Sequence, residues 1–428
     1  MSTPLLAPGT APGPASAPQL IAPHRYDWLA AEVAGWQADG TVTDEQASAI
    51  LGRYHASRRF SLASLILTLG GAFVAVGLVW LVAANLDELS PLVRFLVVAA
   101  LWVAVTVAAE VLAGLRVHGG PVPSPLVAVA RMLAAAALGA VIFQAAQSLQ
   151  VPAYEPKLVG LWALGALLYA YVVKSPAAHV IGLATTVVWF VWQVAWDHPV
   201  ALDLILAFSV IAMAGVAMAV LHERWWPDVA ASWREVGALF GLVALFAAAL
   251  PFVDAEDFRW TLPLSVAVAL TAVAVVGAMA LARGWARWEI LGMLVLAGLA
   301  LLLTWWDTGL EPDQFGSRDL TGADVAHAAV AVVVYVVAAA GVAALGILHD
   351  SWRLTLLATG ALVVFVTFQS FAVFAQIITG AWLFLVLGTV FLLTGYAADR
   401  ARRQLARSID AVEESNVGEA DAPEGAES

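Results

Sequence analysis

The chain has no cysteine, and only 12% of its residues are charged. Without cysteine it can form no disulfide and can offer no thiolate to a metal ion. Its charge content is about half of the roughly 25% that is usual in a soluble domain. The charges sum to −12, whereas a nucleic-acid-binding protein needs a basic surface. These shortages exclude disulfides and thiolate metal sites, and they argue against nucleic acid as a partner.

Recognisable catalytic motifs are also lacking. The sequence contains no glycine loop of the phosphate-binding kind, no HExxH helix, no GxSxG elbow and no zinc-ligand spacing. No catalytic residue, metal ligand or cofactor is therefore predicted, and the chain is expected not to be an enzyme.

Long apolar runs are abundant, since 62% of the residues are hydrophobic. A run of about 20 residues matches a hydrocarbon layer of ~30 Å at ~1.5 Å per helical residue. Twelve such segments can be counted: 61–84, 91–114, 125–148, 157–174, 177–196, 200–221, 234–253, 260–282, 286–306, 325–348, 352–373 and 376–397. The predicted fold is all-α, a polytopic transmembrane bundle of about 12 helices over residues 59–398.

Residues 24–58 contain two apolar stripes with helical spacing, and the second runs from Ala47 to Tyr54. Thr43 fits the N-cap of the second helix, and Gln46 stands three positions later, as in a capping box. The prediction is a cytoplasmic helical hairpin with these defining residues: Trp36, Gly40, Thr43, Gln46 and Tyr54. Such a hairpin either supports its own bundle or docks a partner protein or a second copy of the chain.

The two ends of the chain differ from the rest in composition. Residues 1–23 are rich in alanine and proline and contain no lysine or arginine, so a disordered tail is predicted in place of a signal peptide. Residues 399–428 begin with four arginines, where anionic lipid headgroups would meet them, and continue as an acidic, disordered tail.

The basic residues predict the orientation in the membrane. With the N-terminus in the cytoplasm, the inner set is Arg25, Arg53, Arg58, Arg59, Arg116, Arg131, Lys174, Arg224, Arg234, Arg283, Arg287, Arg353, Arg400, Arg402, Arg403 and Arg407. The outer set is Arg94, Lys157, Arg259 and Arg318. This asymmetry predicts a plasma-membrane protein with both termini in the cytoplasm.

Two charges inside the apolar segments form the first candidate site. Glu110 lies near the inner end of the second segment, and Arg131 lies about two turns into the third. The short connection at 119–125 predicts that the two helices are antiparallel neighbours. Because an isolated charge in hydrocarbon is costly, we expect an ion pair. It either holds two helices together or forms a gated charge pair in a transport path.

Polar residues near the outer ends of the segments form the second candidate site. Their positions predict a shallow, outward-facing polar vestibule, or else separate hydrogen bonds between neighbouring helices. The residues are Gln144, Gln147, Asp203, His327, Gln369 and Gln376.

One regular spacing suggests an internal repeat. Asp87, Asp197 and Asp307 each follow an apolar segment at its outer end, and successive members lie 110 positions apart. Three parallel four-helix units would produce this pattern, because four crossings restore the orientation. Coincidence is the alternative.

Three stretches carry a resemblance to a known family. They are Trp36-Gln37-Ala38-Asp39-Gly40-Thr41-Val42-Thr43-Asp44-Glu45-Gln46, then Ala83-Ala84-Asn85-Leu86-Asp87, then Phe143-Gln144-Ala145-Ala146-Gln147 followed by Leu161-Trp162. Residues 26–175 resemble bacterial predicted membrane proteins of the family known as domain of unknown function 2157. The family usually has tryptophan where this chain has Leu86. The resemblance implies a multi-pass bacterial inner-membrane protein with a cytoplasmic hairpin, marks Asn85 and Asp87 as an outer corner, and implies no activity.

Three functions are compatible with these features. The leading hypothesis is a non-enzymatic membrane scaffold or regulatory component that acts through its cytoplasmic hairpin. The alternative is a transporter for a small or lipid-linked solute that uses the vestibule and the Glu110–Arg131 pair. A membrane enzyme acting on lipid-linked sugars would need a larger outer loop than 307–324. The only partner predicted from composition alone is the lipid bilayer.

Overall fold

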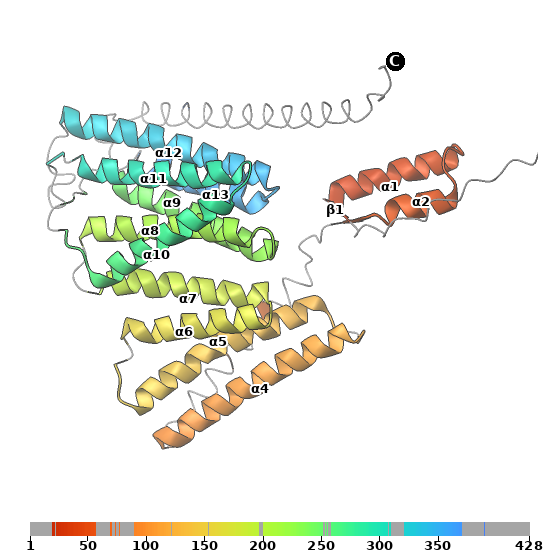
Figure 1. Cartoon of the computed structure of the whole chain (residues 1–428), viewed down its shortest axis with the longest axis horizontal. Coiled ribbons are helices and arrows are strands. Elements are labelled where there is room, and N and C mark those ends of the chain that lie inside the picture. The colour runs from red at the N-terminus through yellow and green to blue at the C-terminus, as the bar shows by residue number, and fades with distance from the viewer. Residues whose placement is uncertain are drawn as a thin grey trace, which may run out of the picture.

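The computed structural model describes residues 19–56 and 90–369, except 22, 121, 153, 197–199, 251–252, 254, 256–257, 307 and 310–320, together with the single positions 69, 70, 73, 77 and 389. Within these residues the chain forms twelve helices and two short strands (Figure 1). Nine of the helices are long and apolar enough to cross a membrane, as judged by length and composition. The prediction of an all-α polytopic bundle is confirmed.

Ten helices make up the described part of the bundle and correspond to the second to eleventh predicted segments. They are α4 (Pro91–Val117), α5 (Ser124–Ser148), α6 (Pro156–Val172), α7 (Pro176–Val194), α8 (Ala201–His222), α9 (Pro227–Ala248), α10 (Leu262–Leu281), α11 (Ala286–Trp305), α12 (Gly322–Leu348) and α13 (Trp352–Gln369). Apart from a few single positions, the first and twelfth predicted segments lie outside the described residues.

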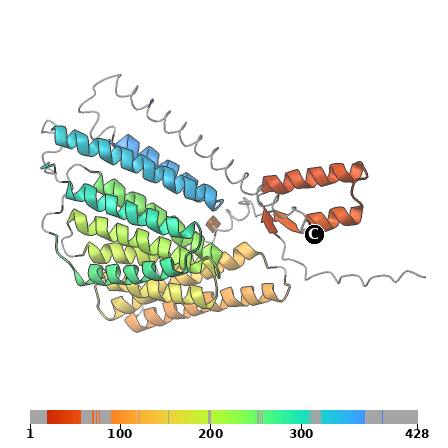
Figure 2. The same cartoon turned by 45° about the horizontal axis from the view of Figure 1, so that its top comes forward.

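Successive helices run in opposite directions, as both views show (Figures 1 and 2). Five connections gather at one end, which we call the short-turn end: 118–123, 173–175, 223–226, 282–285 and 349–351. The connections at the opposite end, the long-loop end, are 149–155, 195–200, 249–261 and 306–321. This alternation brings residues that are distant in sequence together at the same depth.

Helix α8 lies at the centre of the bundle and packs against α7, α9, α10 and α11. Its closest neighbour is α9, because glycines face each other where the two helices cross. A Cβ atom added to Gly215 would stand 2.6 Å from the Cα atom of Gly237. Small residues at such a crossing let two backbones approach closely and gain van der Waals contact in lipid.

Aromatic side chains join α9 to the last two described helices. The rings of Tyr335 on α12 and Phe365 on α13 are stacked, with centroids 3.8 Å apart and planes inclined by 9°. Phe246 on α9 meets Phe365 edge to face at 5.7 Å. Tyr335 and Phe365 are 2% and 0% exposed, so this contact is part of the core and not of the lipid-facing surface.

The N-terminal hairpin consists of α1 (Pro23–Ala38) and α2 (Asp44–Leu51), and Figures 1 and 2 draw it apart from the bundle. Gly40 takes φ +72° in the turn, a conformation that favours glycine. The predicted capping box is present. The Gln46 amide donates to Thr43 Oγ1 at 3.3 Å, and the Thr43 amide donates to Gln46 Oε1 at 2.9 Å. Val33 and Ala47 are buried within the hairpin.

The limits of the hairpin differ from the prediction in two ways. Tyr54 does not continue the second helix, which ends at Leu51, but lies in strand β2 (Tyr54–Ala56). Strand β2 pairs in parallel with β1 (Gln19–Ile21), inside the segment predicted to be a disordered tail. Gly52 is a poor helix former and tyrosine favours strands, which explains the early end of the helix.

The start of α9 is also corrected. The apolar run predicts a membrane segment over 234–253, but the helix begins at Pro227 and ends at Ala248. Proline is well suited to the first position of a helix, and Asp228 in the first turn complements the helix dipole. Arg234 therefore lies two turns inside a helix and not at its flank.

The predicted four-helix repeat stays a prediction, because Asp87, Asp197 and Asp307 lie outside the described residues. In the described part some equivalent pairs pack alike, namely α4 with α5, α8 with α9 and α12 with α13, and others do not. Helix α6 packs on α5, whereas its counterpart α10 packs on α8.

Candidate functional site

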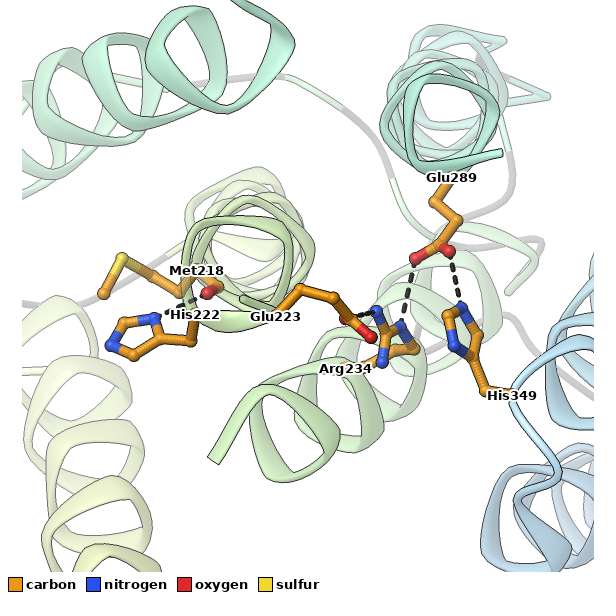
Figure 3. Close-up of polar contacts among 6 residues, drawn as sticks. All are labelled: Met218, His222, Glu223, Arg234, Glu289 and His349. Carbon is orange, nitrogen blue, oxygen red and sulfur yellow. Dashed lines mark hydrogen bonds and ion pairs between the residues drawn. The ribbon is translucent and has the colours of Figure 1, made fainter. Parts of the chain in front are cut away.

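The most buried ion pairs of the described chain form a network near the short-turn end (Figure 3). Its centre is Arg234 on α9, which is 5% exposed, and Glu289 in the first turn of α11, which is 7% exposed. Glu223, the C-cap of α8, and His349, the C-cap of α12, complete the network. Four helices therefore contribute one ionisable side chain each.

Each contact in this network is short and charge-assisted. Arg234 Nη2 donates to Glu223 Oε2 at 2.5 Å, and Arg234 Nε donates to Glu289 Oε2 at 3.0 Å. The other carboxylate oxygen of Glu289 lies 2.6 Å from His349 Nε2. Figure 3 shows this continuous path from Glu223 through Arg234 and Glu289 to His349. The network fixes the ends of α8, α9, α11 and α12 relative to one another.

The charges of the network are nearly balanced. Two glutamates face one arginine, and protonation of His349 brings the four side chains to neutrality. Glu289 is enclosed, while the side chains of His349 and Glu223 are 22% and 47% exposed. A buried carboxylate with partners on both oxygens avoids most of the desolvation penalty that an isolated charge would suffer. The network can hold helices together.

The predicted partners Glu110 and Arg131 lie together in the structure. Arg131 forms a bidentate ion pair with the carboxylate of Glu110. Its Nη2 donates to Oε2 at 2.6 Å, and its Nε donates to Oε1 at 3.0 Å. The Tyr169 hydroxyl on α6 donates to Glu110 Oε1 at 2.7 Å, and Arg131 Nη1 donates to the Val173 carbonyl at 3.2 Å. Sequence reasoning found the pair but missed Tyr169, so the site joins three helices and not two.

The third polar group at the short-turn end combines imidazole and aromatic rings. Both ring nitrogens of His222 form hydrogen bonds. Nδ1 lies 2.7 Å from the Met218 carbonyl oxygen, and Nε2 lies 2.8 Å from the Tyr171 hydroxyl. His179 is 0% exposed, and neither ring nitrogen has a hydrogen-bond partner in the described chain. The His179 ring packs edge to face against the rings of Tyr171 and Trp233. N–H···π contacts in this geometry compensate in part for the missing hydrogen bonds.

The residues predicted to line a vestibule are placed separately. Asp203 caps its own helix by accepting from the Val200 amide at 3.0 Å. His327 bonds the Leu303 carbonyl at 3.2 Å.

Gln369, the third buried member, donates to the Ala249 carbonyl at 3.0 Å. These three residues are 8%, 1% and 1% exposed, and no hydrogen bond joins any two of them within the described chain. Gln144 is half-buried and Gln147 is exposed, whereas Gln376, Asn85 and Asp87 lie outside the described residues. Asp203 therefore caps its own helix, whereas His327 and Gln369 each bond the backbone at the end of another helix, as the alternative of separate hydrogen bonds expects.

We expect Glu110→Gln and Arg131→Met to differ in severity. The glutamine keeps the shape of Glu110 and can still accept from Tyr169, so this variant should lose only the charge. The methionine leaves Glu110 partly buried without its cation, which costs about 3 kcal/mol or more. Thermal unfolding of the two purified variants in detergent measures the loss of stability in each. Equal unfolding temperatures would contradict a structural role for the ion pair.

The long apolar helices, with ion pairs buried between them, are those of a multi-pass α-helical membrane protein. Residues 34–179 match the model of a family described as predicted membrane protein (DUF2157). This match confirms the family resemblance over the end of α1, over α2 and over the helices that hold Glu110, Arg131 and Tyr169. Comparison with curated proteins and with solved structures finds no match. In the described residues, no three histidine, aspartate or glutamate side chains are grouped as a metal ion would require.

Proposed function

We propose that the chain is a non-enzymatic scaffold or regulatory component of the bacterial inner membrane that acts through its N-terminal hairpin. The observation that carries this proposal is the surface of α1, where Trp28 and Trp36 are 62% and 37% exposed. Tryptophan is enriched at the centres of protein interfaces and is costly to leave in water. A capped, strand-paired hairpin that presents two tryptophans is suited to hold a partner protein.

The net negative charge of the hairpin favours a partner with basic residues. Residues 19–56 carry five acidic residues and two arginines, a difference of −3: Asp27, Glu32, Asp39, Asp44 and Glu45 against Arg25 and Arg53. A partner that combines an apolar patch with basic residues complements this surface.

The distribution of basic residues supports a cytoplasmic hairpin. Eight lie at the short-turn end of the described bundle: Arg116, Arg131, Lys174, Arg224, Arg234, Arg283, Arg287 and Arg353. Three described basic residues lie at the long-loop end: Arg94, Lys157 and Arg259. Cytoplasmic segments carry an excess of lysine and arginine, so the short-turn end is assigned to the cytoplasm. The hairpin is assigned to the same side.

The absence of native cysteine allows a direct test of the hairpin. A single cysteine placed at exposed Ala38 should be shielded from a membrane-impermeant maleimide in intact cells and should react after lysis. A photo-crosslinker attached there should capture one dominant partner, and Trp28→Ala with Trp36→Ala should abolish the capture without lowering the amount of membrane protein. The matched control is Trp260→Ala, which is also exposed but lies at the long-loop end.

Two results would contradict the proposal: labelling of the hairpin from outside the cell, or capture that does not depend on the two tryptophans. Capture lost equally in the control variant would also count against a hairpin interface.

A second candidate, transport of a small or lipid-linked solute, is favoured by the buried carboxylates themselves. Ionisable groups within membrane helices commonly mark solute or proton paths, and Glu289 contacts a second ionisable group, His349, at 2.6 Å. The Glu110 and Arg131 variants separate the two functions. A normal amount of protein with a lost cellular phenotype favours transport, whereas loss of the protein itself favours a structural role.

A further inference from the structure

Three neighbouring connections at the short-turn end, taken together with the first residues of the helices that follow them, each present arginine beside exposed tryptophan. We call this set the Arg–Trp surface. Its residues are Arg224 and Trp225, Arg283 and Trp285, Arg287 and Trp288, and Trp352 and Arg353. The four tryptophans are 59%, 66%, 66% and 64% exposed, in chain order. No other described connection at this end contains tryptophan.

The buried network places these connections next to one another. Glu223 immediately precedes Arg224, and it bonds Arg234, which in turn bonds Glu289 of α11. Glu289 lies directly after Trp288, so the turns at 223–226 and 282–285 are held together. His349 joins the turn at 349–351 to the same carboxylate. The Arg–Trp surface is therefore a fixed arrangement of three turns.

The arginines of this surface retain free donors, unlike the buried arginines. No contact within the described chain engages Arg224 or Arg283. Arg287 uses only Nε, which donates to the Ala282 carbonyl at 3.0 Å, so both of its Nη groups remain available. Arg353 lies 3.6 Å from Glu235, in an exposed and weak pair.

Five acids lie near this surface, and three of them are paired with cations. Glu223, Glu235 and Glu289 are engaged with cations, and Asp228 and Asp350 are the exposed acids of the same connections.

We propose that the Arg–Trp surface binds the phosphate groups of anionic phospholipids in the adjoining leaflet. Guanidinium groups match phosphate oxygens with paired hydrogen bonds, and tryptophan rings settle at the level of lipid headgroups. Both features occur here on the same turns. A free phosphate would use the arginines alone, so the exposed rings favour a lipid. This inference is independent of the hairpin and its partner.

The test is retention of lipid by the full-length protein in non-ionic detergent. Native mass spectrometry counts the phosphatidylglycerol and phosphatidylcholine molecules that remain bound after exchange from mixed vesicles. The wild-type chain should retain phosphatidylglycerol in preference. Arg224→Gln, Arg283→Gln and Arg287→Gln together should reduce this preference by about fivefold for each arginine, as expected from the attraction of one basic residue to an anionic surface.

Matched controls come from the opposite end of the bundle. Lys157→Gln and Arg259→Gln remove two exposed basic residues from the long-loop end and should leave the preference unchanged. Arg→Lys at the same three positions should retain most of it.

An equal loss in the control variants, no preference in the wild type, or displacement of the lipid by inorganic phosphate would each overturn the proposal. Unchanged thermal unfolding in the glutamine variant shows that any loss of lipid is not a loss of fold.

Discussion

Replacing Arg234 by methionine should destabilise the protein by about 3–5 kcal/mol, because it removes the cation that, among the described residues, contacts both Glu223 and Glu289. Glu289 is 7% exposed and would then keep a single partner, His349. The carboxylate would have to remain ionised in an apolar surrounding or take up a proton, and both outcomes raise the free energy of the folded state. The expected result is a lower unfolding temperature in detergent and less protein in the membrane.

Two further variants separate this charge effect from a packing effect. Arg224→Met removes an exposed arginine near the same network and should change stability by less than about 0.5 kcal/mol. Arg234→Met combined with Glu289→Gln removes the stranded charge and should recover part of the loss. A coupling of about 0.5–3 kcal/mol between the two sites is expected from residues in one network. If the double variant is as unstable as the sum of the single variants, the network does not act as described.

The sequence predicts one of the two ion-pair groups and misses the other for a physical reason. Glu110 and Arg131 lie 21 positions apart on helices joined by a short connection, so their proximity follows from the chain itself. Arg234 and Glu289 lie 55 positions apart, and the contact depends on how four helices pack. The apolar run begins at Arg234, so an apolar-run criterion places this residue at the flank of the segment and not two turns inside the helix.

The hairpin is predictable because its signals are local. The capping box needs only Thr43 and Gln46 at a spacing of three, and both of its bonds are present. The pairing of β1 with β2 joins residues 35 positions apart, such as Gln19 and Tyr54, so no local sequence pattern predicts it. The vestibule stays a prediction, since similar depth in the membrane does not tell which helices are neighbours and Gln376 lies outside the described residues.

A large side chain at the crossing of α8 and α9 is expected to cause the second large loss of stability. Gly215→Leu should destabilise the bundle by about 1–3 kcal/mol or more, because the added side chain has no room. A Cβ atom at this position would stand 2.6 Å from Gly237 Cα and 2.8 Å from the Trp233 carbonyl oxygen. Both neighbours are backbone atoms of α9, so no flexible side chain can move aside, and the helices must separate.

The matched control is Gly277→Leu on α10, where an added Cβ atom meets nothing within 4 Å. It has the same helix-propensity change without the close approach, so it should unfold near the wild-type temperature. Separation of α8 from α9 would also strain the bond between Glu223 and Arg234, which lie at the short-turn ends of the same two helices. Gly215→Leu should therefore weaken the charge network as well as the apolar core. The two effects together predict that combining it with Arg234→Met costs less than the sum of the single variants, and a thermal-unfolding cycle of the four proteins measures that difference. Simple additivity would mean that the crossing and the network act independently.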